Sequence, residues 1–141
     1  MNIDMNISAS VKNSSSSHKV TVKTNERETD LNIPAKTDGR GSSINGGELL
    51  FLSLASCYCN DIFREAKGMG IEVNTVEVDV EGKFVGKGEP TTLINYDVKI
   101  SAEANEKQIK SLLQYTDSVA EIQNTLRMGI PVNLRHIEIL K

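Results

Sequence analysis

The sequence predicts an α+β domain in which mainly antiparallel strands surround one long, buried helix. The first observation is the order of patterns: alternating apolar and polar segments, a long helical segment, two more alternating segments, two shorter helical segments and a last alternating segment. That order is typical of α+β folds. The second observation is the long helical segment at residues 46–68, whose first half is apolar on almost every side. A helix of that kind is expected to be buried on every side.

Residues 1–45 are expected to form short antiparallel strands followed by a loop. The serine run at residues 14–17 predicts a turn between two strands, and the glycine-rich residues 34–47 predict the loop. Alternation of apolar and polar residues marks the strands on either side of the turn and one further strand. The apolar positions are Ile3, Met5, Ile7 and Val11 before the turn, Val20 and Val22 after it, and Leu31 and Ile33 further on.

Residues 71–141 are expected to contain two long strands, two helices and a last strand. The strands cover about 71–80 and 93–100, and a break in the alternation between Val73 and Val76 predicts a β-bulge. Helices are expected over about 105–117 and 118–127, where Gly129 and Pro131 end the second one. The last strand is expected over 132–140. A chain of 141 residues fits one domain, residues 1–141, with the helix at 46–68 at its centre.

Composition and charge exclude several functional classes. A formal net charge of -3 gives no general attraction to nucleic acid or anionic lipid. The longest nearly apolar run, residues 49–59, is too short to span a bilayer, and no secretory signal is visible. We therefore expect a cytoplasmic protein without nucleic-acid or membrane partners. The sequence holds no metal-ligand cluster and no phosphate-binding loop, so no cofactor and no metal are expected.

Two cysteines, Cys57 and Cys59, lie on the long helix. Residues two apart on a helix point to nearly opposite sides, which argues against a disulfide between them. Cys57 is either a reactive thiol or a small buried apolar residue, and both readings stay open. Asp61 lies one turn after Cys57 on the same face, where its carboxylate would disfavour a thiolate. Cys59 is expected to be a small apolar residue, and only weakly a second reactive thiol.

Three charged residues are weaker candidates for a site. Glu48 lies in the first turn of the helix, where its negative charge interacts favourably with the helix dipole. Arg40 lies in the glycine-rich loop, and Arg127 lies near a helix end, where its ordinary role is to bond the last carbonyl groups. A thiolate at Cys57 would need a cation nearby, and Arg40 and Arg127 are the arginines available for that role.

Two segments resemble a known family, the osmotically inducible protein C and organic hydroperoxide resistance (OsmC/Ohr) proteins. The first consists of Asn45-Gly46-Gly47-Glu48-Leu49-Leu50 and Leu54-Ala55-Ser56-Cys57, which is similar to the family's central helix. The second is Asn124-Thr125-Leu126-Arg127-Met128-Gly129-Ile130-Pro131-Val132, which is similar to the segment after the family's second cysteine. The order of elements also agrees over nearly the whole chain.

The resemblance implies an OsmC-like fold and an intertwined homodimer with two buried helices at its centre. It also implies a thiol peroxidase site at the dimer interface. In the family, a reactive cysteine attacks an organic hydroperoxide, and a second cysteine resolves the sulfenic acid. An arginine and a glutamate hold the first cysteine as a thiolate.

Of those four groups only Cys57 matches securely, because Ala120 stands at the second cysteine's position. Two functions follow. In one, the chain is a thiol-dependent organic hydroperoxide reductase (peroxiredoxin-like), with an external thiol or Cys59 completing the cycle. In the other, it is a non-catalytic OsmC-like module that binds a small apolar ligand at the dimer interface.

Overall fold

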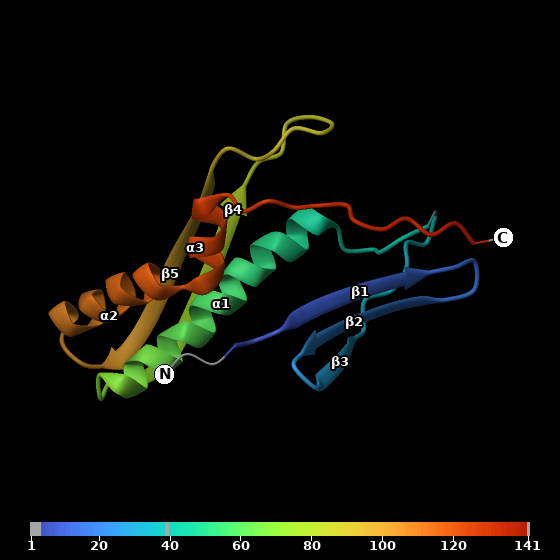
Figure 1. Cartoon of the computed structure of the whole chain (residues 1–141). Coiled ribbons are helices and arrows are strands. Elements are labelled where there is room, and N and C mark those ends of the chain that lie inside the picture. Colours follow the sequence, from blue (N-terminus) through green and yellow to red (C-terminus); the bar gives the residue numbers. More distant parts are fainter. Residues whose placement is uncertain (1–3, 39, 141) are drawn as a thin grey trace. The chain divides into compact units, whose positions relative to one another are not determined.

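The structure is a computed structural model that describes residues 4–38 and 40–140 (Figure 1). The described residues form helices and antiparallel sheets, which confirms the α+β class. The chain divides into two compact units, Met1–Leu49 and Leu50–Lys141. In the described part of the chain, no helix has both the length and the apolar character that a membrane crossing needs.

The N-terminal unit is a three-stranded antiparallel sheet in the order β1 (Ile7–Asn13), β2 (His18–Thr24) and β3 (Arg27–Leu31). The serine run forms the expected turn between β1 and β2, where the backbone N–H of Ser14 donates to the carbonyl of Ser17 at 2.9 Å. The expected first strand is wrong at its beginning, since β1 starts only at Ile7; Ile3 lies outside the described residues. The third strand ends at Leu31, before Ile33.

Helix α1 (Gly46–Gly68) has the limits that the sequence predicts. It begins at a capping box, in which the Asn45 side chain accepts from the backbone N–H of Glu48 at 2.8 Å and Glu48 accepts from that of Asn45 at 3.0 Å. It ends where Gly70 takes a left-handed conformation with φ of 68°. The N–H of Ile71 then returns to the carbonyl of Ala66 at 2.9 Å.

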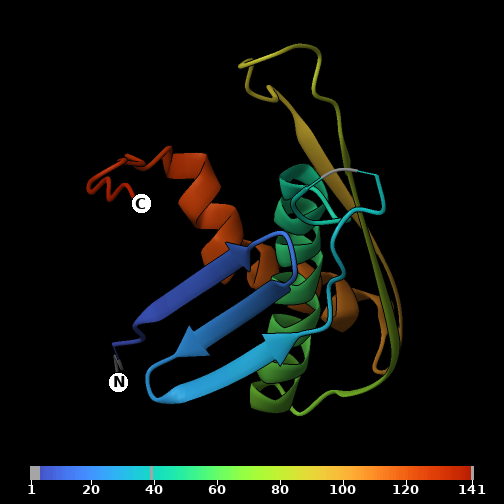
Figure 2. The same ribbon diagram turned by 90° about the vertical axis from the view of Figure 1, so that its right-hand side faces the viewer.

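The C-terminal unit places helices on a two-stranded ribbon. Strands β4 (Glu72–Gly82) and β5 (Ile94–Glu103) pair antiparallel, and the register shift between Val73 and Thr75 confirms the expected bulge. Helix α2 (Glu106–Val119) follows, and α3 (Glu121–Met128) ends at Gly129, which has φ of 64°. Figure 2 shows the helices on one side of the β4–β5 ribbon.

One stripe of α1 forms the core of this unit. Tyr58, Ile62 and Ala66 recur every four residues, so they share one face of the helix, and all three are buried. They pack with Leu112 of α2 and with Ala120, which joins α2 to α3. The ribbon contributes the alternate residues of one face, namely Val73, Val76, Val78, Tyr96, Val98, Ile100 and Ala102.

The expected last strand over residues 132–140 is wrong. Residues 130–140 are exposed and belong to no strand in the described chain. The alternation is real, with Val132 94% and Leu134 86% exposed. A strand, however, needs a neighbouring strand to satisfy its backbone groups, and this segment pairs with none of the described strands.

The expectation that the first half of α1 is buried on every side also fails within this one chain. Leu54 is buried, but Leu52 is 61% exposed. The described residues of the chain therefore cover one side of this part of the helix and leave another side open to solvent.

We expect Leu112→Ala to lower the free energy of unfolding by about 3 kcal/mol, because a fully buried leucine is replaced by a cavity. The matched control is Tyr115→Ala on the same helix, where the side chain is 52% exposed and the loss should be small. Urea unfolding followed by circular dichroism measures both. Equal midpoints for the two variants would contradict this packing.

Candidate functional site

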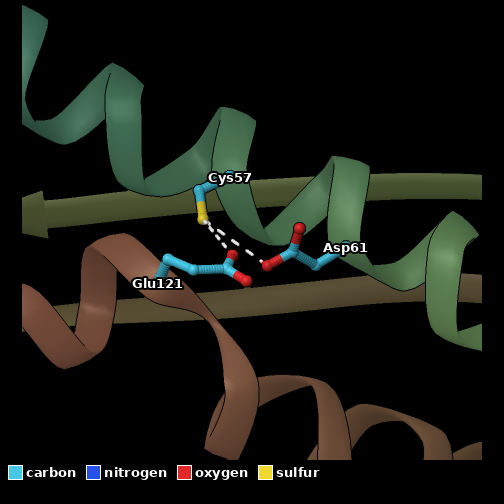
Figure 3. Close-up of side chains that lie close together, drawn as sticks. All are labelled: Cys57, Asp61 and Glu121. Carbon is cyan, nitrogen blue, oxygen red and sulfur yellow. Dashed lines mark hydrogen bonds between the residues drawn. The ribbon is translucent and has the colours of Figure 1, made fainter. Parts of the chain in front are cut away.

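The side chain of Cys57 lies between two carboxylates (Figure 3). Cys57 and Asp61 lie one turn apart on α1, and the thiol donates to Asp61 Oδ2 at 3.6 Å. Glu121 extends from the first turn of α3, and its Oε1 lies 4.0 Å from the sulfur. We call Cys57, Asp61 and Glu121 the thiol cluster. Helix geometry brings Asp61 to the sulfur, and the packing of α3 brings Glu121 there.

Arg64 is the cation of this region, and it binds the carboxylates and not the sulfur. Its Nη1 lies 3.1 Å from Asp61 Oδ1 and 3.3 Å from Glu121 Oε2. Its Nε donates to Glu65 at 2.6 Å. One guanidinium therefore faces three carboxylates, so the cluster keeps an excess of negative charge.

This environment favours the neutral thiol. Burial raises the pKa of Cys57 above its usual value, and the charges of Asp61 and Glu121 raise it further. The backbone N–H of Ile122 faces the sulfur and acts in the opposite direction, but the net change in pKa is upward. Because only a thiolate is a strong nucleophile, these surroundings disfavour the reactive form of Cys57.

The two carboxyl groups of the thiol cluster differ in pKa. Burial, followed by the hydrogen bond and charge of Glu121, raises the pKa of Asp61 to about 6, against the effect of Arg64. Burial alone would also raise the pKa of Glu121, but its own backbone N–H, Asp61 and Arg64 together lower it. The two carboxyl groups thus hold negative charge beside the sulfur, and forming a thiolate would add a further negative charge next to it.

The thiol cluster contains three atoms of kinds that bind metals. The sulfur and one oxygen from each carboxylate lie within 4.8 Å of one another. However, the guanidinium of Arg64 already binds both carboxylates. A divalent cation would have to displace it, so we interpret the cluster as a hydrogen-bonded group and not as a metal centre.

Glu48 and Arg40 have structural partners in the N-terminal unit. Glu48 completes the capping box with Asn45, a structural role at the start of α1 in addition to the first-turn charge expected for it. The Nε of Arg40 donates to the side chain of Asn13 at 3.2 Å.

Arg127 joins a second polar group in the C-terminal unit. Its Nη2 lies 2.8 Å from Asp117 Oδ1, and its Nη1 donates to the Asp117 carbonyl at 3.2 Å. The Tyr96 hydroxyl also donates to Asp117. Burial alone would raise the pKa of Asp117, but these bonds from Tyr96 and Arg127 lower it. The carbonyl that Arg127 binds lies near the end of α2 and not at the end of α3, its own helix, where the sequence places the capping role.

Cys59 is a free, half-buried thiol and makes no hydrogen bond with Cys57. Ala120, at the expected position of a second cysteine, is fully buried in the core. Glu121 was not among the sequence candidates. The sequence held one indication of its role, since Glu121 directly follows Ala120 and the resemblance places position 120 close to Cys57.

The comparisons with known proteins agree on one family. A model of the OsmC-like protein family matches residues 39–135. Among curated proteins, none matches this sequence well enough to count as a relative.

Three solved structures share the fold. An OsmC-like protein from Mycoplasma pneumoniae is 20% identical, with a TM-score of 0.65 over 92% of this chain and 91% of its own. A hypothetical protein from Aquifex aeolicus VF5 is 21% identical, with a TM-score of 0.58 over 92% and 90%. An organic hydroperoxide resistance protein OsmC from Legionella pneumophila is 19% identical, with a TM-score of 0.50 over 89% and 90%.

The family match covers more than half of the sequence, and the solved structures share its fold. This chain belongs to the OsmC-like protein family.

Proposed function

We propose that this chain is a non-catalytic OsmC-like module, which forms a homodimer in the cytoplasm and binds a small apolar ligand where the two chains meet. The observation that carries the proposal is the position of the Cys57 thiol, whose single proton faces two carboxylates, with Asp61 Oδ2 at 3.6 Å and Glu121 Oε1 at 4.0 Å from the sulfur. A peroxidatic cysteine needs the opposite environment, with a cation that stabilises its thiolate.

The buried Ala120 also supports the proposal, because a cycle with two cysteines has no second sulfur at that position. Cys59 is an unsuitable replacement. It lies two residues from Cys57 on an intact helix, and a disulfide between such positions would require α1 to unwind.

A second copy of the chain is the simplest cover for the exposed apolar side of α1. Leu52 and Phe63 lie about three turns apart and so share one face, and they are 61% and 49% exposed. The exposed residues 130–140 add an apolar segment with unpaired backbone. Soluble monomers rarely leave apolar surface of this extent open, whereas dimer interfaces are built from it.

The second candidate is a hydroperoxide reductase that uses Cys57 and an external thiol. The observation that favours it is the backbone N–H of Ile122, which faces the sulfur and lowers the pKa of Cys57. The thiolate would attack the terminal oxygen of the peroxide, forming a sulfenic acid and releasing the alcohol after one proton is taken up. Two molecules of a small thiol would then reduce the sulfenic acid, yielding water and their disulfide.

Reaction with a hydroperoxide separates the two candidates. We expect the reduced protein, mixed with cumene hydroperoxide at neutral pH, to lose thiols no faster than free cysteine does, because Cys57 is a neutral thiol. Timed titration of free thiols measures this, with Cys57→Ser and Cys59→Ser as the paired variants. Rapid loss of one thiol per chain, abolished only by Cys57→Ser, would refute the non-catalytic proposal and establish the reductase.

Removing the carboxylates should activate Cys57. In a Cys59→Ser background, we expect Asp61→Asn and Glu121→Gln each to raise the rate of alkylation by iodoacetamide at pH 7.5 by roughly threefold to tenfold. Each change removes a charge that raises the thiol pKa, and one unit of pKa changes the thiolate fraction about tenfold. The rate against pH should keep its shape and move to lower pH.

Glu65→Gln is the matched control, because Glu65 contacts Arg64 and makes no hydrogen bond to Cys57. Its alkylation rate should stay near that of the parent. If all three variants react alike, the two carboxylates do not control the thiol.

The homodimer is tested by sedimentation at micromolar concentration. We expect the parent protein to sediment as a dimer and Phe63→Glu to shift it toward the monomer, since a charge would be buried in the interface. Lys107→Glu, at an exposed position of α2 and therefore away from this face of α1, is the control for a change of charge alone. A parent protein that sediments as a monomer would refute this part of the proposal.

A further inference from the structure

A small cavity lies between α1, β5 and α3, all within the C-terminal unit. Its volume is about 100 Å³. Its lining residues are Leu54, Ile94, Tyr96, Gln123, Leu126 and Arg127. No member of the thiol cluster lines it, so its chemistry is set by three aliphatic side chains and the polar groups beside them.

Gln123 is the unusual group in this lining. It is 3% exposed, and its Nε2 donates to the carbonyl of Leu54 at 3.0 Å. That bond fixes the orientation of the amide, since the reverse orientation would set two acceptors against each other. The amide oxygen is left buried without a hydrogen-bond partner. A buried acceptor without a donor has lost its bonds to water and gained none, so a molecule that supplied the donor would recover part of this cost.

The charges of the lining exclude an anion as the occupant. Arg127 is the cation at the cavity, and its guanidinium is already paired with the Asp117 carboxylate and bonded to Asn124 Oδ1 at 3.1 Å. The Tyr96 hydroxyl also donates to Asp117. The group that still lacks a partner is therefore Gln123 Oε1, which can accept from a neutral hydrogen-bond donor. The surface beside it is formed by Leu54, Ile94 and Leu126.

We propose that this cavity binds a small neutral alcohol. The hydroxyl donates to Gln123 Oε1, and the aliphatic part lies against Leu54, Ile94 and Leu126. An engineered apolar cavity of about 150 Å³ accepts benzene, which has six heavy atoms, so this smaller cavity suits a molecule of about four or five heavy atoms. This proposal goes beyond the function proposed above, because the site lies within one chain and involves neither Cys57 nor the dimer.

Two isomers of equal size, 1-butanol and diethyl ether, provide the test. The alcohol has a hydroxyl donor, and the ether has only an acceptor. In methyl NMR titrations of the full chain, we expect both to shift the signals of Leu54, Ile94 and Leu126 with saturation. The alcohol should bind about fivefold more tightly, which corresponds to one ordinary hydrogen bond. Equal binding, tighter binding of the ether, or no saturable shift, as when only water fills the cavity, would each overturn the proposal.

Two variants test the location. Leu126→Trp places a larger side chain over the cavity and should abolish binding; Leu126 is 40% exposed, so the fold should accept the change. Met128→Trp, on the same helix at an 80% exposed position outside the lining, should bind as the parent does.

A third variant tests the hydrogen bond. The side chain in Gln123→Met has similar shape and no amide oxygen, so this variant should bind the alcohol and the ether equally. Should Gln123→Met fail to fold, the isomer pair and Leu126→Trp still decide the question.

A fast reaction of Cys57 with hydroperoxide would refute the non-catalytic function and leave these titrations unchanged. The two proposals therefore fail separately.

Discussion

Burial of one stripe of α1 determines where the remaining side chains of the C-terminal unit can lie. Tyr58, Ile62 and Ala66 pack against Leu112 and the ribbon, and this packing fixes the rotation of the helix about its own axis. Each residue advances about 100° around a helix, so the direction of every other α1 side chain follows. The neighbouring stripe then faces α3, where Cys57 meets Glu121 and the carbonyl of Leu54 meets Gln123. The thiol cluster and the small cavity beside Gln123 thus depend on the same packing of α1.

The limits of α1 and the Asp61 contact were predictable because they depend on residues close together in the sequence. The capping box at Asn45 and Glu48 and the glycines at 68 and 70 act within one turn, and the i, i+4 spacing places Asp61 at the sulfur. The bulge after Val73 also follows from local alternation. In each case the physical cause lies within a few residues, so the sequence pattern contains the information.

Glu121 and Gln123 were not predicted because their partners are distant in sequence. Glu121 meets Cys57 across 64 residues, and Gln123 meets Leu54 across 69. A helical pattern over α3 cannot show which α1 residue each will face. The incorrect strand at 132–140 has a related cause. Alternation shows that a segment is suited to a sheet, but pairing depends on an available edge, and no described strand of this chain pairs with it.

The turn between α2 and α3 is where this sequence departs from the pattern of the family it resembles. The resemblance to OsmC/Ohr proteins sets a resolving cysteine at position 120, where this chain has a buried alanine that packs with Tyr58 and Ile62. The polar group nearest the sulfur is then Glu121, one residue later, which accepts from the thiol instead of oxidising with it. After oxidation of Cys57, a second cysteine could form a disulfide with it. A carboxylate forms no such bond, and its charge disfavours the loss of the thiol proton that must come before oxidation. Ala120 and Glu121 lie where α2 ends and α3 begins, so the connection between the two helices places the carboxylate of Glu121 beside the sulfur.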